Sequence, residues 1–264
     1  MFELFPEMSL SAMVDSAIEL LQAAQPKEPY WGCFSGGKDS VVIKELARLA
    51  GVRVEWHYNV TTIDPPELIR FMYRHHKDVV RDRPTKYKNI AEVVARRGFP
   101  TRAHRFCCDV LKHSRSPVGR DVILGVRAAE SAARANRWGE VSYFAPSKSN
   151  AICPIYYWKN EDVWEFIRSR GLPYCELYDQ GYKRLGCIGC MMASVEQRKR
   201  DLERWPFAKR LWMKGIRDLW ARKDDEWRYR YRAFATPEDL LDWWVSDSGT
   251  PQGCDMALFS SGNE

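Results

Sequence analysis

The spacing of apolar residues predicts a chain in which helices and short strands alternate. Residues 9–24 carry apolar side chains at helical spacing, and Pro26 follows them. The short apolar run 30–34 is typical of a buried strand. Residues 39–50 again have helical spacing, and Gly51 after them is a helix-ending residue. The chain therefore opens with a helix, a strand and a second helix.

The same pattern continues and indicates the fold class. Residues 52–58 alternate as in a strand, and 65–76 have helical spacing. A further strand is predicted at 121–126 and a helix at 161–170, whereas 195–244 is helical, charged and aromatic. A strand–loop–helix–strand–helix opening predicts an α/β fold with a doubly wound, mostly parallel sheet.

Length and composition change this picture little. The 264 residues suit one α/β domain over residues 1–190 and a helical, basic, aromatic-rich region over residues 191–264. No run of about 18 apolar residues occurs, and the acidic start lacks the features of a secretory signal, so we expect no membrane contact and a cytoplasmic location. The net charge of +6 permits a polyanionic partner without requiring one.

That positive charge is concentrated in residues 195–234, where 13 Lys or Arg stand against 7 Asp or Glu, interleaved with aromatic residues. Such a surface can follow a phosphate backbone and stack on bases. In the alternative, amphipathic helices bury the aromatic side chains and expose the charges. The near-heptad spacing of Trp205, Trp212 and Trp220 favours the second interpretation.

A glycine-rich loop joins the first predicted strand to the next helix, and its sequence is Ser35-Gly36-Gly37-Lys38-Asp39-Ser40. Two glycines let the backbone approach an oxyanion, and a helix N-terminus directs free N–H groups toward it. Lys38 can neutralise phosphate charge, Ser35 and Ser40 can bond phosphate oxygens, and Asp39 is a candidate Mg²⁺ ligand. The alternative is an ordinary turn. Asp39 after the lysine distinguishes the loop from a Walker A motif.

This loop resembles the PP-loop of the ATP pyrophosphatases, which holds the pyrophosphate end of ATP. Over about residues 28–192 the chain resembles their phosphoadenosine phosphosulfate (PAPS) reductase-like branch, which has the adenine nucleotide alpha hydrolase-like fold. The matching segments are Asn59-Val-Thr61-Thr62-Ile-Asp-Pro-Pro-Glu67, Gly125-Val-Arg127 with Ser131, and Pro154-Ile-Tyr-Tyr-Trp158 with Asp162-Val-Trp164. The resemblance implies that Asn59, Thr61 and Thr62 lie beside the base and ribose, and that Gly125 and Arg127 lie beside the phosphates.

Two cysteine pairs, Cys107-Cys108 and Cys187-Ile-Gly-Cys190, stand out among eight cysteines. Four thiolates suit a [4Fe–4S] cluster or zinc, and unliganded redox thiols are a third possibility. Adjacent cysteines fit one zinc tetrahedron poorly, which favours the cluster. The layout resembles the cluster-binding reductases of the branch, and the resemblance places Lys112 near the cluster. Cys33, Cys153 and Cys175 are expected to be packed thiols.

Two features depart from those reductases. They carry a degraded Ser-Phe-Gly loop, whereas this chain keeps the complete motif, which suits an enzyme that splits ATP. Sulfate adenylyltransferases of the branch keep the loop but lack the four cysteines. The reductases also end with a nucleophile in Glu-Cys-Gly-Ile/Leu-His, whereas Cys254 stands in Gln-Gly-Cys-Asp. Cys254 is therefore either a swinging nucleophile or an inert tail thiol, and its neighbours favour the latter.

An intact loop together with a cluster is most similar to the sulfurtransferases of the branch, such as the DndC-like proteins of DNA phosphorothioation. We therefore expect an ATP pyrophosphatase that adenylates an acceptor, such as DNA or RNA, for sulfur transfer. Lys38, Asp39 and Arg127 would be catalytic, with ATP, Mg²⁺ and [4Fe–4S] as cofactors and a cysteine desulfurase or other sulfur donor as partner. The alternatives are a PAPS or adenylyl-sulfate reductase using Cys254, and a non-catalytic nucleotide-binding subunit. The sequence leaves the oligomeric state open.

Overall fold

The computed structural model describes residues 8–102, 104–113, 115, 117–222, 231 and 233–246. The chain packs into two compact units. The first contains Met1–Asn59, Pro66–Asp82 and Ser116–Leu185, and the second contains Val60–Pro65, Arg83–Arg115 and Gly186–Glu264. A single division near residue 190 does not describe this packing, because two internal segments join the C-terminal region.

The first unit is built on one mixed, mostly parallel sheet of six strands in the order β3-β2-β1-β4-β6-β5. All neighbouring strands are parallel except β5 and β6, which form an antiparallel pair at one edge. The strands are β1 (Tyr30–Cys33), β2 (Val54–Asn59), β3 (Val80–Asp82), β4 (Val122–Ile123), β5 (Val141–Phe144) and β6 (Ser149–Ile152). The predicted fold class is confirmed.

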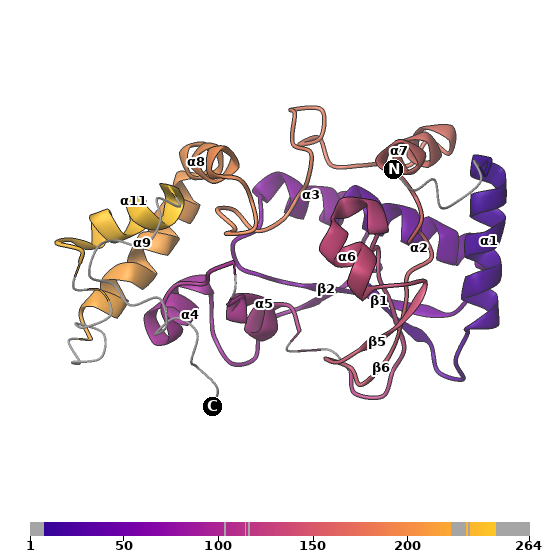
Figure 1. Ribbon diagram of the computed structural model, residues 1–264, viewed down its shortest axis with the longest axis horizontal. Coiled ribbons are helices and arrows are strands. Elements are labelled where there is room, and N and C mark those ends of the chain that lie inside the picture. The colour runs from indigo at the N-terminus through magenta and orange to yellow at the C-terminus, as the bar shows by residue number, and fades with distance from the viewer. Residues whose placement is uncertain are drawn as a thin grey trace. The chain divides into compact units, whose positions relative to one another are not determined.

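Four helices of the first unit match predicted ranges to within one residue at each end (Figure 1). Ser9 caps helix α1 (Leu10–Ala23) by accepting a hydrogen bond from the Ala12 amide, and α1 packs on α2 (Lys38–Ala50). Gly51 ends α2 with a φ of 66°, which glycine adopts without strain. The other two matching helices are α3 (Pro66–His75) and α7 (Asn160–Ser169), whereas the short 3₁₀ helix η1 (Ala128–Glu130) and α6 (Ala132–Arg137) were not predicted.

Helix α2 is the central helix of this unit. Val42, Ile43 and Leu46 are completely buried, and α2 contacts both α1 and α7. Burying such a side chain contributes about 1.5–3 kcal/mol. The packing fixes the N-terminus of α2 directly after β1, which is where the glycine-rich loop lies.

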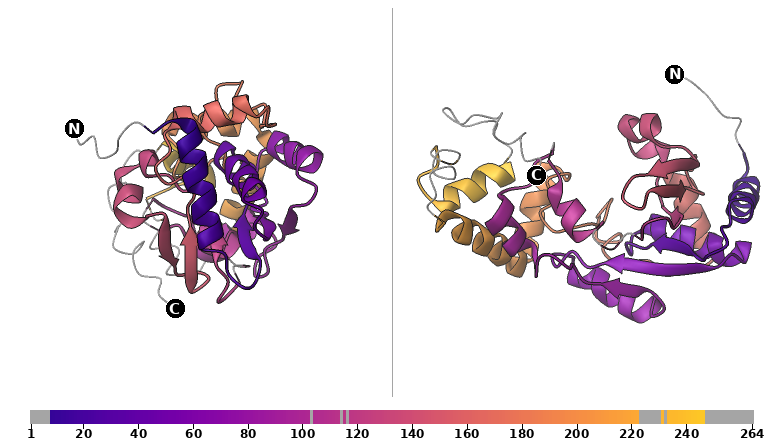
Figure 2. Two further views of the ribbon diagram at one scale, coloured as in Figure 1. Left: turned by 90° about the vertical axis from the view of Figure 1, so that its right-hand side faces the viewer. Right: turned by 90° about the horizontal axis from the view of Figure 1, so that it is seen from below.

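The second unit is helical in the part that the structure describes. It contains α4 (Ile90–Arg97), α5 (Phe106–Leu111), α8 (Val195–Arg204), α9 (Pro206–Trp220) and α11 (Pro237–Ser246). Helices α4, α9 and α11 lie side by side (Figures 1 and 2). Gly215 allows α9 to approach α4, since a Cβ on this residue would lie 2.8 Å from the carbonyl oxygen of Ala91.

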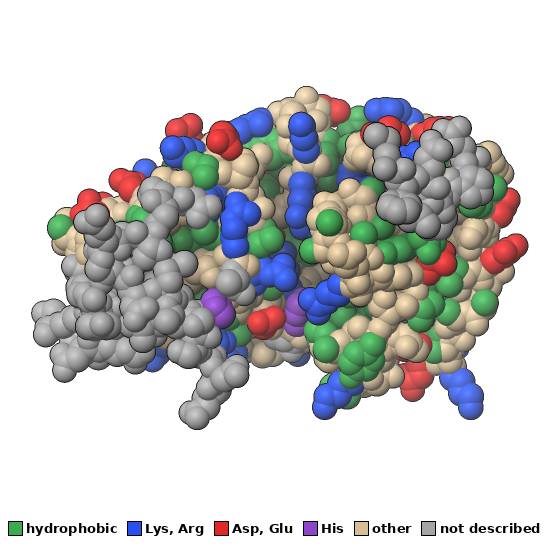
Figure 3. Space-filling model, viewed as in Figure 1, with side chains coloured by type: hydrophobic (Ala, Val, Ile, Leu, Met, Phe, Trp, Pro, Cys, Tyr) green, Lys and Arg blue, Asp and Glu red, His purple; other side chains and the backbone are tan. Residues whose placement is uncertain are grey.

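Three tryptophans of this region form core, whereas Trp220 and Trp243 are half-buried and Phe207 is exposed. Trp205 is 5% exposed and Trp212 is 2% exposed, and Trp212 packs on Trp244 with ring centroids 4.5 Å apart. Lys and Arg side chains alternate with Asp and Glu over α8 (Figure 3), where Lys199 and Glu203 are exposed. Trp227 and Tyr229 lie outside the described residues. The described tryptophans thus follow the amphipathic-helix interpretation.

None of the described helices combines the length and the apolar character needed to cross a membrane.

Replacing Gly215 with Ala tests the close approach of α4 and α9. Alanine favours a helix by about 1 kcal/mol, but overpacking a tight contact costs about 1–3 kcal/mol. The new Cβ would also lie 2.9 Å from the Cβ of Val94. We expect Gly215→Ala to lower the free energy of unfolding by up to about 2 kcal/mol in urea titrations.

Gly139→Ala is the control, because the nearest atom to its new Cβ is 3.7 Å away. A Gly215→Ala protein more stable than the parent would show that the two helices are free to separate.

Candidate functional site

The glycine-rich loop of the first unit is shaped for glycine at its centre. Gly36 has a φ of 75°, and a Cβ there would lie 2.7 Å from the Cδ1 of Leu68. Gly37 precedes the first residue of α2 and, having no side chain, provides no cap of its own to that helix N-terminus. Both glycines therefore leave backbone open at the positive end of the α2 dipole, as an anion site requires.

The two serines of the motif brace the loop. The Ser40 hydroxyl donates to the carbonyl oxygen of Gly37 at 2.7 Å. Two longer hydrogen bonds, each of 3.4 Å, complete the bracing. The Gly37 amide donates to Ser35 Oγ, and the Ser35 hydroxyl donates to Ser40 Oγ. All three of these bonds join residues within the motif itself.

The acidic residue of the motif lies between two buried cations. One carboxylate oxygen of Asp39 is 2.9 Å from Lys38 Nζ, and the other is 2.7 Å from Arg127 Nε. Lys38 is 5% exposed and Arg127 is 4% exposed. Two cations and one carboxylate leave an excess positive charge at the loop. The role of Asp39 as a Mg²⁺ ligand stays a prediction, because both of its oxygens are engaged in ion pairs.

Arg127 reaches the loop from the neighbouring strand. Strands β1 and β4 are adjacent, and the chain order of the strands reverses between them, which makes this the switch point of the sheet. Ligands of doubly wound folds bind in the crevice at such a point. Gly125 follows β4, and a Cβ there would lie 3.2 Å from the backbone of Asp39. The segments predicted to contact phosphates therefore meet at the expected edge.

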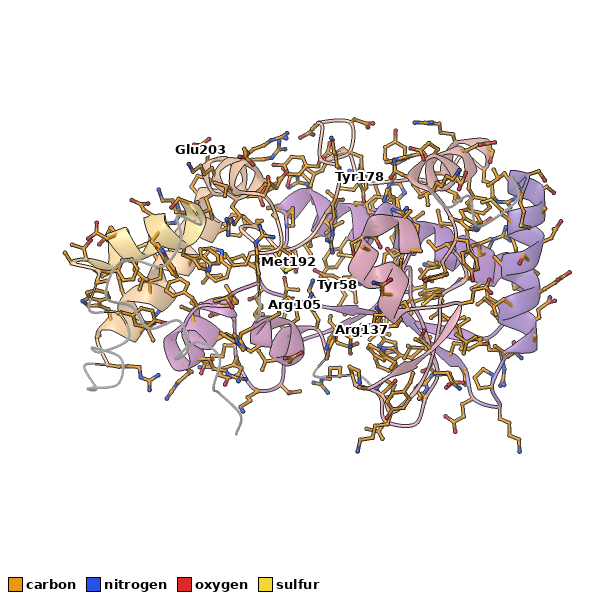
Figure 4. All side chains as sticks on the ribbon, viewed as in Figure 1. Tyr58, Arg105, Arg137, Tyr178, Met192 and Glu203 are labelled. Atoms are coloured by element: carbon orange, nitrogen blue, oxygen red, sulfur yellow. The ribbon has the colours of Figure 1, made fainter. Side chains whose placement is uncertain are left out.

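The structure adds Tyr178, which the sequence did not indicate (Figure 4). Its hydroxyl accepts a hydrogen bond of 2.9 Å from the backbone amide of Lys38. Burial raises the pKa of Tyr178 above its usual range, and the nearby Asp39 carboxylate adds to this shift. No sequence motif connects the two residues, which are 140 positions apart.

Three residues predicted to lie beside the base and ribose are found after β2, in different surroundings. Asn59 ends β2 in the first unit, and its buried side-chain oxygen has no hydrogen-bond partner among the described residues. Thr61 and Thr62 belong to the second unit. Thr62 has a φ of 68° and accepts a hydrogen bond from the Ile90 amide. A β-branched residue in this conformation is strained, as residues at functional sites often are. Nucleotide contact by the three remains a prediction.

All four predicted metal-ligating cysteines line one cavity of the second unit. Cys107 and Cys108 lie on α5, and Cys187 and Cys190 precede α8. The cavity also contains Lys112, Thr61 and Trp212. The four cysteines are free thiols. Among the described residues, no three His, Cys, Asp or Glu side chains are already in position to hold a metal ion.

The cysteines of this cavity differ in how readily they ionise, because the pKa of Cys108 is lowered whereas the pKa values of Cys107 and Cys187 are raised. A hydrogen bond from Cys107 lowers the pKa of Cys108 to about 6, with help from Lys112 and Arg105. Burial raises the pKa of Cys187 to about 11, although Lys112 opposes the shift. The thiolates in turn raise the pKa of Lys112 above its usual range, Cys187 most of all. A half-buried cation beside soft donors suits a metal group that carries thiolate charge.

The other described cysteines lie elsewhere, as predicted. Cys153 and Cys175 are buried in the first unit, and Cys33 ends β1. Burial raises the pKa of Cys33 and of Cys153 to about 12 in each case. Cys254 lies outside the described residues.

The low pKa of Cys108 gives a test on metal-free protein. A thiol reacts with iodoacetamide as its thiolate, so alkylation of Cys108 should rise as the pH passes upward through about 6. Cys107→Ala removes the hydrogen bond that most lowers this pKa, and we expect its midpoint to move to higher pH. Peptide mass spectrometry measures the modified fraction.

Cys153→Ala is the control and should leave the Cys108 midpoint unchanged. A Cys108 midpoint above pH 8 in the parent would contradict the electrostatic description of the cavity.

Comparison with known proteins gives the family. Residues 29–193 match the model of the phosphoadenosine phosphosulfate reductase domain. The adenosine 5'-phosphosulfate reductase of Staphylococcus epidermidis is 39% identical over 83 residues, which span 31% of this chain and only 34% of that protein. The enzyme of the same name from Allochromatium vinosum is 29% identical over 195 residues, 67% of this chain and 74% of that protein.

A solved structure shares the fold. The phosphoadenylyl-sulfate reductase of Candida auris, in a phosphate complex, aligns with a TM-score of 0.51 at 16% identity, covering 69% of this chain and 96% of that one. This likeness shows the adenine nucleotide alpha hydrolase-like fold alone. Because the family model covers more than half of the sequence, the chain belongs to the phosphoadenosine phosphosulfate reductase domain family.

Proposed function

We propose that this chain is an ATP pyrophosphatase that adenylates an acceptor for sulfur transfer. The observation that carries the proposal is the complete glycine-rich loop with Lys38 and Arg127 buried beside it. A loop that binds a nucleotide without pyrophosphate has no need of this excess positive charge. The open N-terminus of α2 adds N–H donors for the same anion.

The loop residues would act through positioning and charge. An acceptor oxygen attacks the α-phosphorus of ATP, the bond from that phosphorus to the pyrophosphate oxygen breaks, and the acceptor proton passes to solvent. Lys38 and Arg127 exchange Asp39 for phosphate oxygens and stabilise the negative charge that develops on the leaving pyrophosphate. Mg²⁺ would neutralise further phosphate charge when bound, and Asp39, released from its ion pairs, is the residue that would hold it.

The cysteine cavity would hold a [4Fe–4S] cluster rather than zinc. The donor set fits, since four thiols line the cavity and Lys112 supplies a compensating positive charge. The cysteines that would hold the cluster are Cys107, Cys108, Cys187 and Cys190. A bound cluster supplies inorganic sulfur or electrons for the sulfur-transfer step. Thr61 adds a side-chain hydrogen bond to Cys187.

The acceptor that we favour is a nucleic acid, DNA or RNA. Lys199, Lys209 and Arg210 are exposed on α8 and α9, where they can meet a phosphate backbone. A cysteine desulfurase or another sulfur donor would provide the sulfur. The free thiols of the described residues suit the reducing cytoplasm, where we place the protein.

Pyrophosphate release tests the adenylation step. Protein purified without oxygen is given ATP and Mg²⁺ with DNA, with tRNA or with no acceptor. We expect release that at least one acceptor stimulates, and a loss of about 100-fold or more in Lys38→Ala, because a preorganised cation at the leaving group is removed. Lys77→Ala is the matched control, since Lys77 is exposed at the end of α3.

A second candidate function is supported by the names of the relatives, which are adenosine 5'-phosphosulfate reductases. If the protein releases no pyrophosphate but converts adenosine 5'-phosphosulfate to sulfite with a thiol reductant, the adenylation proposal is wrong. Loss of that sulfite in Cys254→Ser would then assign the nucleophile.

Metal analysis tests the cysteine cavity separately. We expect about four irons and four acid-labile sulfides per chain after anaerobic purification. Cys187→Ser should lose most of this iron, whereas Cys175→Ser, which changes a buried cysteine of the first unit, should keep it. One zinc per chain without sulfide would contradict the cluster.

A further inference from the structure

Tyr178 is the residue at the loop that the functions above do not use. It lies between α7 and the second cysteine pair, in the first unit. Its hydroxyl oxygen is 2.9 Å from the Lys38 amide nitrogen and would be 3.3 Å from a Cβ on Gly37. The phenol therefore contacts the backbone groups that an anion in the loop would bind (Figure 4).

A compact turn and an aromatic cluster hold Tyr178 in this position. The Tyr178 amide donates to the carbonyl oxygen of Cys175 at 3.1 Å, and the Gly181 amide donates to that of Tyr178 at 3.1 Å. The ring packs edge-on against Trp164 with centroids 5.1 Å apart. Tyr174 contacts both rings, with its centroid 6.5 Å from that of Tyr178 and 5.2 Å from that of Trp164. Rigid placement lets one hydroxyl serve as a defined ligand.

The hydroxyl has a hydrogen-bond donor to spare. A phenol can donate one hydrogen bond and accept others. Tyr178 accepts from Lys38, and among the residues that the structure describes no acceptor takes its proton. Burial raises the pKa of Tyr178, so the proton stays on the oxygen at neutral pH. An uncharged donor that already lies against the loop is suited to a phosphate oxygen.

We propose that Tyr178 is a direct ligand of the nucleotide phosphates. In the free protein its hydroxyl oxygen accepts a hydrogen bond from the Lys38 amide. Once that amide binds the anion, the hydroxyl donates a hydrogen bond to a phosphate oxygen. This inference rests on the proposed function, because it needs a phosphate group in the loop. The amide exchanges one oxygen partner for another, and the phenol gains a charged acceptor. Hydrogen bonds to charged groups are stronger than those between neutral groups.

Calorimetric titration of the whole protein with inorganic pyrophosphate and with ATP tests the role of Tyr178. Tyr178→Phe removes the hydroxyl and keeps the ring. We expect affinity for both ligands to fall about tenfold or more, as for loss of a hydrogen bond to a charged group.

Tyr174→Phe is the matched control. It lies in the same aromatic cluster, but its hydroxyl donates to Asp179 at 3.1 Å and not to the loop. Its affinity for pyrophosphate should equal that of the parent. Urea unfolding without ligand completes the comparison, since Tyr178→Phe should retain most of the parent stability if the hydroxyl serves the ligand.

Each outcome separates this inference from the function on which it rests. If neither the parent protein nor Lys38→Ala binds pyrophosphate or ATP, the proposal that the loop binds ATP is wrong. Parent protein that binds both, with Tyr178→Phe binding equally or more tightly, would overturn only the role of Tyr178. In the tighter case the hydroxyl is a competitor that phosphate displaces.

Discussion

The ion pairs of Asp39 are the interaction on which the first unit's site depends. The carboxylate lies between Lys38 and Arg127, which come from the loops after two adjacent strands. Two buried cations without a counter-charge would repel each other and lack water, which is a strongly destabilising arrangement. Asp39 therefore holds the two cations together at the switch point of the sheet and leaves a net positive charge there. In the proposed function a phosphate group replaces the carboxylate, because it offers the same kind of oxygen.

The cysteine cavity of the second unit reverses this arrangement of charge. There one half-buried cation, Lys112, stands among four cysteine thiols, of which Cys108 is the most easily ionised. The loop is prepared to receive an anion, whereas the cavity is prepared to carry thiolate charge of its own. In the proposed function the two sites serve different parts of one reaction, nucleotide activation and sulfur chemistry.

The sequence predicted features whose causes are local. The loop between β1 and α2 was recognisable because its glycines, lysine and serines are consecutive, and Gly51 marked the end of α2. Arg127 followed from a motif after a predicted strand.

Tyr178 was missed because its contact with Lys38 spans 140 residues and depends on a turn that no periodicity reveals. The antiparallel β5–β6 edge was missed because its strands are short and partly exposed. The composition of the second unit was missed because its segments are far apart in the sequence.

The interleaving of the two units along the chain has a consequence for synthesis on the ribosome. The chain passes from one unit to the other after residues 59, 65, 82, 115 and 185. Helix α4 emerges early, yet its main packing partner, α9, begins only at Pro206. The apolar face of α4, with Val93 and Val94, must wait for more than a hundred further residues before it is covered. Such long-range closure slows folding and leaves a nascent chain exposed to aggregation, so the second unit is the part of this protein that has most to gain from a chaperone.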